Sequence, residues 1–219
     1  MISWRRVVPI ATVVIASLLT APIASAQTGS LTTGFEDWSG WCSGLYVDLT
    51  ASVPLTVTSF DVYFKGTLNR NVSVYYKAGT YVGSETTPGA WTLLGTVNVS
   101  PGGTGTATAV NLGGVAIPAG QTYAFYFVDL LGTGGPDGGG LNLDLTPSPV
   151  SNADLTLNSS MRTCDTPFTD PEGGMGWEGT VYYQLGGQAI PVLGTTALAG
   201  LATLVLFLGW FVLRQRSAT

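Results

Sequence analysis

The stretch that decides the fold is TVTSFDVYFK, residues 56–65. Its apolar and polar side chains alternate, which is the period of a β-strand whose successive side chains point to opposite faces. One face carries Phe60, Val62 and Phe64, and the other carries Asp61, Tyr63 and Lys65. This alternation predicts a strand that is buried on its aromatic and aliphatic face.

Similar strand-like segments recur along the chain and are separated by turn residues such as Ala78-Gly79, Pro88-Gly89, residues 101–103 and residues 117–120. We expect further strands over residues 44–49, 71–77, 91–99, 106–112, 121–129, 141–145, 154–157 and 180–185. No helical period lies between them, and no internal repeat indicates a propeller or a solenoid. The pattern predicts an all-β domain over residues 27–185, an antiparallel, jelly-roll-like β-sandwich.

The N-terminal segment has the pattern of a secretory signal peptide. Arg5 and Arg6 precede an apolar run over residues 7–19, and Ala24-Ser25-Ala26 matches a small-residue cleavage site. We expect residues 1–26 to be removed after Ala26, the alternative being an uncleaved N-terminal anchor. The arginine pair also raises a twin-arginine export route.

The C-terminal segment predicts a transmembrane helix over residues 193–213. These 21 residues carry no charge, and as a helix they would extend roughly 31 Å, the thickness of a bilayer core. Arg214 and Arg216 follow in a basic tail, residues 214–219. Because basic residues stay on the cytoplasmic side, we expect the tail inside, the preceding domain outside at the cell surface, and residues 186–192 as a linker.

The composition of the expected exported part excludes several functions. Its four basic and 13 acidic residues give a formal charge of −9, which disfavours nucleic acid as a partner. The chain has no histidine, so nucleophilic triads built on Ser-His or Cys-His are absent. We therefore expect no catalytic activity, no cofactor and no resident metal.

Cys42 and Cys164 are the only cysteines of the chain, and both lie in the expected exported part. In an oxidising compartment such a pair usually forms a disulfide, which is our prediction, and the alternative is two separate thiols.

The C-terminal segment resembles the sorting signals of bacterial surface proteins of the IPTL-CTERM type, which are related to PEP-CTERM. The matching residues are Ile190, Pro191, Leu193, Arg214 and Arg216, together with the apolar segment between them. Val192 stands where that signal has threonine, and Gly186-Gly187 resembles a related Gly-Gly signal. The resemblance implies recognition by an exosortase-type processing enzyme, whereas without cleavage the helix is a permanent anchor.

The domain itself resembles a group of exported bacterial β-sandwich domains that has no assigned activity. The similarity runs over residues 31–183 and is carried by residues 72–83, 91–95, 118–126 and 177–183. It implies the fold and implies no catalytic residues.

The residue types allow three kinds of site to be considered: a glycosidase site, a calcium site and a sugar-binding site. A glycosidase needs two carboxylates at a fixed separation, and the candidates are Glu36, Asp37, Asp170, Glu172 and Glu178. Because they lie in Gly- and Pro-rich loops, we interpret them as turn-capping and solubilising residues. Calcium would need clustered oxygens, and the candidates are Asp129, Asp137, Asn142 and Asp144, which lack EF-hand spacing.

Sugar binding would use the flat faces of tryptophans. Trp38 and Trp41 are the candidates, whereas Trp91 and Trp177 begin expected strands, and we expect them to pack in the core. The prediction is therefore an exported, membrane-anchored or enzymatically processed surface protein with a structural or adhesive role in a matrix or surface layer. The alternatives are, in order, a carbohydrate-binding module that contacts extracellular polysaccharide and a glycosidase.

Overall fold

The computed structural model describes residues 27–35, 41–132, 139–145 and 149–186 of the chain. The expected signal peptide, transmembrane helix and basic tail lie outside the described residues, as do Ile190, Pro191, Leu193, Arg214 and Arg216. Within the described ranges, no helix is long and apolar enough to span a membrane.

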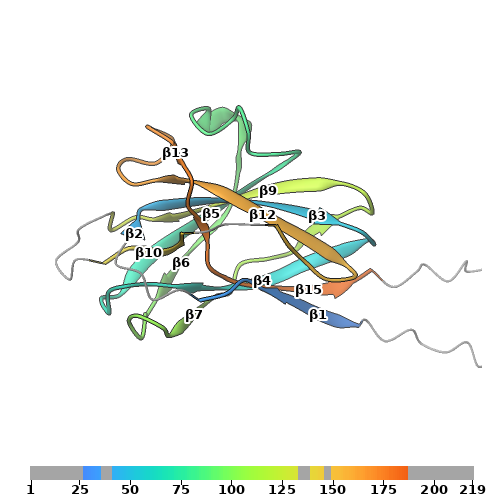
Figure 1. Ribbon diagram of the computed structural model, residues 1–219, viewed down its shortest axis with the longest axis horizontal. Helices are drawn as coiled ribbons and strands as arrows, with labels where there is room; N and C mark the ends of the chain where they lie inside the picture. Colours follow the sequence, from blue (N-terminus) through green and yellow to red (C-terminus); the bar gives the residue numbers. More distant parts are fainter. Residues whose placement is uncertain (1–26, 36–40, 133–138, 146–148, 187–219) are drawn as a thin grey trace, which may run out of the picture.

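The described chain folds into a β-sandwich of two main antiparallel sheets (Figure 1). The first, here called the β4 sheet, has the order β1 (Thr28–Thr32), β15 (Gly179–Leu185), β4 (Leu55–Tyr63) and β7 (Ala107–Val110), with β8 (Val115–Ile117) also paired to β4. The second, the β9 sheet, has the order β11 (Val150–Ser151), β12 (Leu155–Thr163), β3 (Gly44–Ala51), β9 (Thr122–Asp129), β5 (Arg70–Ala78) and β6 (Thr92–Val99), with β13 (Glu172–Gly173) paired to β12. The expected antiparallel sandwich is confirmed.

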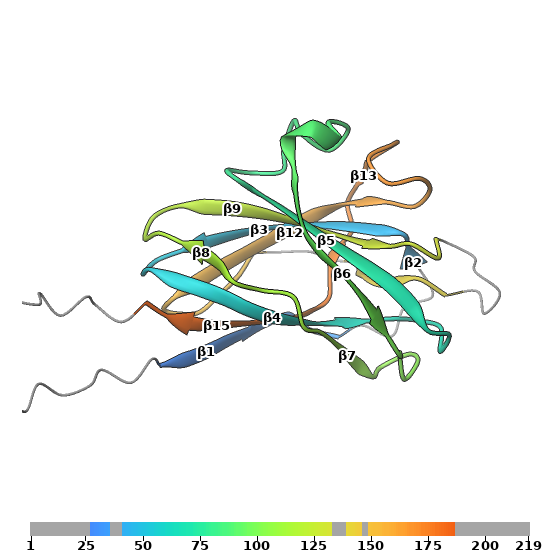
Figure 2. The same ribbon diagram turned by 180° about the vertical axis from the view of Figure 1, so that it is seen from behind.

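A short sheet joins the two layers at one end of the sandwich. Its order is β14 (Gly176–Trp177), β10 (Leu141–Asp144) and β2 (Trp41–Cys42). The opposite end holds both ends of the described chain, because β1 and β15 pair with each other and the Leu185 amide donates to the Gln27 carbonyl at 2.8 Å. Figures 1 and 2 show the start of β1 and the end of β15 side by side at this end.

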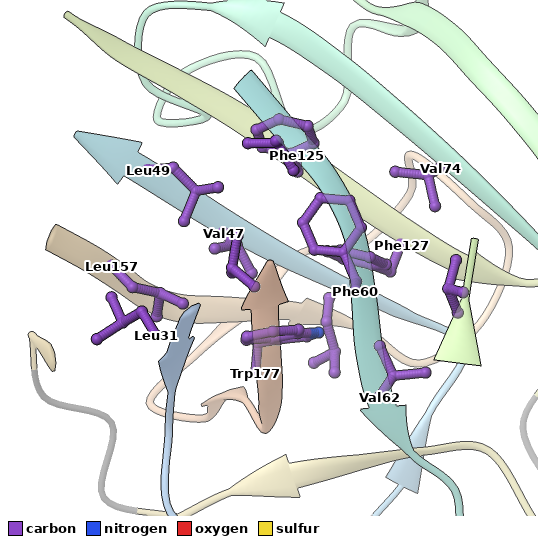
Figure 3. Packing of buried hydrophobic residues seen from close by; sticks show 14 of the residues in the cluster. Leu31, Val47, Leu49, Phe60, Val62, Val74, Phe125, Phe127, Leu157 and Trp177 are labelled. Atoms are coloured by element: carbon purple, nitrogen blue, oxygen red, sulfur yellow. The ribbon is translucent and has the colours of Figure 1, made fainter. Parts of the chain in front are cut away.

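The core lies between the sheets and is built on the inward face of β4 (Figure 3). Phe60 packs edge-on against Phe125 and Phe127 of β9, with ring centroids 5.3 and 4.9 Å apart. Trp177 stacks on Phe127 at 5.6 Å and contacts Gly179, where a side chain would collide with the ring. Each such fully buried aromatic contributes about 1.5–3 kcal/mol through removal of apolar surface from water.

The strand prediction underestimates β12 and misses β1 and β8. β12 continues six residues beyond the expected 154–157, through Asn158 to Thr163. Ser159 is buried there because its hydroxyl donates to the Tyr46 carbonyl and accepts from the Trp177 amide. β1 has a polar sequence with one buried residue, and Ile117, expected in a turn, closes β8.

Cys42 and Cys164 form the predicted disulfide. The bond connects β2 to the segment that follows β12, across a sequence separation of 122 residues. It therefore closes most of the domain into one covalent loop.

We expect replacement of both cysteines by serine to lower the free energy of unfolding by about 5 kcal/mol at most, the loop-entropy value for this separation. The measurement is urea denaturation of the oxidised wild type, the reduced wild type and the double variant. The reduced protein should match the double variant. Equal stability of the oxidised and reduced wild type, or thiols that alkylate without reductant, would contradict this role.

Candidate functional site

Among the described residues, the buried Glu178 and the exposed Glu172 do not share one accessible catalytic site. Glu178 is buried and accepts a hydrogen bond from the Asn142 amide at 2.6 Å. Glu172 is exposed and pairs with Arg162 at 2.6 Å. Asp170 lies in the loop before β13, and Glu36 and Asp37 lie outside the described residues. The buried and the exposed carboxylates therefore occupy different environments.

The calcium candidates have other bonding roles. Asp129 forms an ion pair with Arg70, and the amide of Asn142 donates to Glu178. Asp144 ends β10, and Asp137 lies outside the described residues. In the part of the chain that the structure describes, no three His, Cys, Asp or Glu residues gather as a metal site.

The Arg70–Asp129 pair is the main buried charge interaction of the described domain. Nη1 of Arg70 lies 2.5 Å from Oδ2 of Asp129, and neither side chain is exposed to solvent. The guanidinium also lies 5.7 Å from the centre of the Phe64 ring. Since charges without partners are very unfavourable in the interior, each side chain depends on the other.

We expect Asp129→Asn to lower the free energy of unfolding by about 3–5 kcal/mol, because it removes the carboxylate charge that pairs with the buried Arg70 guanidinium. Glu172→Gln is the matched control, since it breaks the exposed ion pair with Arg162, where the expected loss is about 1 kcal/mol or less. Denaturant titration of both variants is the measurement. Similar losses in the two variants would show that the buried pair has no special structural role.

The tryptophans divide between the core and the surface. Trp91 and Trp177 are buried, as expected. Trp41 is half-buried at the end of β2, and the Lys65 ammonium lies 4.3 Å from the centre of its ring. A cation over a ring face interacts with the same surface that a sugar would use, so Trp41 does not offer both faces for stacking. Trp38 lies outside the described residues.

A second aromatic cluster covers the outward face of the β9 sheet. Tyr46 of β3 stacks on Tyr126 of β9 with ring centroids 4.0 Å apart. Trp91 lies 5.9 Å from both rings, and Phe168 packs edge-on against Tyr126 at 4.9 Å. Because the loops that contain Tyr81, Trp91 and Phe168 lie over this face, the two central tyrosines are buried.

Asp48 of β3 holds one of these loops in place. Its carboxylate accepts hydrogen bonds from the Thr80 hydroxyl at 2.5 Å and from the Tyr81 amide at 3.0 Å. Burial raises the pKa of Asp48, and the two hydrogen bonds and the charge of Lys77 oppose the increase. The folded domain therefore holds a proton on this carboxyl at a pH where the unfolded chain has lost it.

The stability of the wild type should therefore rise relative to Asp48→Asn as the pH falls from neutral through the raised pKa toward the ordinary value of 3.8. The sign follows because a raised carboxyl pKa makes the folded state bind more protons than the unfolded state in that range. Free energies of unfolding of both proteins, measured between pH 3.5 and pH 7 (about the range in which carboxyls titrate), test this. Parallel pH profiles would contradict it.

The outward face of the β4 sheet carries a row of side chains here called the outer strip: Tyr182, Asp61, Tyr63 and Phe35. Asp61 and Tyr63 alternate with the buried Phe60 and Val62 along β4, and the buried Phe64 follows the strand. Tyr182 comes from β15 and donates its hydroxyl to Asp61 Oδ2 at 2.7 Å. The ring of Phe35, which follows β1, lies 4.8 Å from that of Tyr63.

The outer strip is accessible, in contrast to the aromatic cluster on the other sheet. Phe35 and Tyr182 are each 37% exposed, which is high for aromatic side chains, and Tyr63 is half-buried. The hydrogen bond to Asp61 raises the pKa of the Tyr182 phenol, with burial as a smaller cause. The phenol therefore stays neutral and remains a donor to the carboxylate.

Only part of the outer strip is evident in the sequence. The alternation in residues 56–65 places Asp61 and Tyr63 together, and the strand expected at 180–185 places Tyr182 on one face. Sequence reasoning missed that β15 pairs with β4, with Tyr182 opposite Ser59, and that Phe35 returns over this face. The β15–β4 pairing joins residues more than 100 positions apart and the Phe35–Tyr63 contact joins residues 28 apart, and local pattern encodes neither.

No protein-family model and no curated protein matches this chain. Among solved structures, the chain is similar to part of a chain in the structure described as "Structure of infectious bursal disease virus Gt strain". The TM-score is 0.27 and the identity 13%, over 77% of this chain and 34% of the viral chain. The chain thus spans about a third of the viral chain's length, and a likeness at this TM-score identifies neither a family nor a function.

Proposed function

We propose that the chain is an exported cell-surface protein whose β-sandwich has a structural or adhesive role in a surface layer or matrix. The single observation that carries the proposal is the Cys42–Cys164 disulfide. This bond contains both cysteines of the chain. Stable disulfides form in oxidising compartments such as the periplasm and the cell exterior. The buried charges and engaged carboxylates suit a rigid, non-catalytic domain.

The positions of the domain's ends support a single anchor. Gln27 would be the first residue after signal-peptide removal, and it hydrogen-bonds to Leu185 at the end of β15. The expected linker at 186–192 starts beside it, ahead of the expected helix at 193–213 and the basic tail at 214–219. In this arrangement the end that holds β2, β10 and the disulfide faces away from the membrane, with the N-terminus outside.

We also propose a strand order for the sandwich, a sorting enzyme and a membrane topology. The jelly-roll-like strand order is the form that we propose for the sandwich. An exosortase-type enzyme would recognise Ile190, Pro191 and Leu193, with Arg214 and Arg216 retained on the cytoplasmic side. If this enzyme does not cleave the chain, the same helix serves as a permanent membrane anchor.

We expect mass spectrometry of the protein from cell envelopes to give Gln27 as the first residue and an oxidised Cys42–Cys164 pair. The C-terminal peptide then separates cleavage near residues 186–193 from retention of the helix. Replacing both Arg214 and Arg216 with Glu should disturb the retention of the protein in the membrane or its orientation there. Replacing both with Lys is the charge-conserving control. Full-length protein in the soluble cytosol, with an intact leader and reduced cysteines, would refute the proposed function.

A further inference from the structure

The outer strip combines three chemical features on one open sheet face. It presents two rings that are each 37% exposed, Phe35 and Tyr182, and the half-buried ring of Tyr63. It also presents the Asp61 carboxylate, which the Tyr182 hydroxyl orients from 2.7 Å. On the same face, the exposed Thr32 hydroxyl is paired at 2.9 Å with that of Thr180, which is itself buried.

The outer strip runs along β4 and is long enough to contact several units of an extended oligomeric ligand. Tyr182 lies opposite Ser59 of β4, four residues before Tyr63. At about 3.3 Å per residue, this offset places the two backbone positions roughly 13 Å apart along the strand. The Phe35 ring adds to the aromatic surface beside Tyr63, with the two ring centroids 4.8 Å apart.

We propose that the outer strip binds a neutral polysaccharide laid along β4. The apolar faces of sugar rings stack on exposed aromatic rings, and sugar hydroxyls donate to the Asp61 carboxylate, whose Oδ2 already accepts from Tyr182. Hydrogen bonds to a charged acceptor are stronger than bonds between neutral groups. Tyr182 therefore supplies a stacking ring and fixes the acceptor beside it.

The surroundings of the strip favour this occupant over others. The neighbouring outward residues are small or polar, as at Thr56, Thr58, Ala107, Ala109 and Gln184. Such a face lacks the broad apolar centre that stable protein interfaces need. A carboxylate within the strip, on a domain of formal charge −9, disfavours acidic glycans and nucleic acids.

This inference rests on the proposed surface location, since an exported domain is the form that meets extracellular polysaccharide. It differs in its residues from the tryptophan-based expectation, because Trp41 is engaged by Lys65. The two proposals can fail separately, since binding is measured on purified protein and export is measured in cells.

The test is native affinity electrophoresis of the oxidised full-length protein in mild detergent. The gels contain a soluble β-glucan, xylan, mannan or dextran as neutral probes, or alginate as an acidic contrast. We expect at least one neutral probe to retard the wild type and alginate to leave its mobility unchanged. Tyr63→Ala and Tyr182→Ala should each raise the dissociation constant at least about fivefold, the scale of one aromatic stacking contact.

Two controls separate ring stacking from general damage. Tyr182→Phe keeps the ring and removes the hydroxyl, so it should bind more tightly than Tyr182→Ala. Leu93→Ala changes a residue that is 52% exposed on β6 of the other sheet and should bind as the wild type does. If Tyr63→Ala does not fold, Tyr182→Ala alone provides the test. The Tyr182 ring is exposed and lies outside the core cluster, so its removal leaves the core packing unchanged.

The proposal is overturned if no neutral probe retards the wild type or if only alginate does. It is also overturned if Tyr182→Ala, with its disulfide and circular dichroism unchanged, binds as tightly as the wild type. The amount of the Tyr182→Ala variant displayed at the cell surface is measured in parallel. Lost binding with normal exposure supports the outer strip, and unaltered binding refutes it whatever the outcome for export.

Discussion

The alternation of side chains along β4 is the constraint on which the core and the exposed face both depend. Phe60, Val62 and Phe64 point into the sandwich, so Asp61 and Tyr63 must point outward. A shift of one residue in the pairing with β15 or β7 would exchange the two sets and place a carboxylate in the core. The packing of Phe60 against Phe125 and Phe127 therefore also fixes the composition of the outer strip.

The sequence predicted the strands that carry regular alternation and missed those that do not. Residues 56–65 and 71–77 coincide closely with β4 and β5 because apolar residues alternate in them, and residues 121–129 coincide with β9 because residues 123–128 form a continuous apolar run. The length of β12 was underestimated because its second half is polar. Ser159 in that half is held by hydrogen bonds to the backbone of Tyr46 and Trp177 and buries no apolar side chain. The disulfide was predictable because the chain offers only one pair of cysteines.

The site was predictable only within single strands. Asp61 and Tyr63 follow from alternation, whereas the contact between Tyr182 and Asp61 joins residues 121 positions apart. Asp129 illustrates the opposite error, because a carboxylate beside a Gly-rich loop was a calcium candidate and is the partner of Arg70 in the structure. Residue type and spacing do not distinguish a metal ligand from half of a buried ion pair.

The two outward sheet faces both carry aromatic rings, and loops determine which rings reach solvent. On the β9 sheet, Phe168 takes a φ of 63° to pack on Tyr126 and Tyr75. That backbone conformation costs about 1–2 kcal/mol in a non-glycine residue, and the partial burial of the Phe168 ring offsets part of this cost. The β4 sheet gains no comparable cover from described loops other than Phe35, whose own ring stays 37% exposed. Among the described residues, loops therefore close the aromatic face of the β9 sheet and leave the rings of the outer strip open, which is the condition that the proposed polysaccharide site requires.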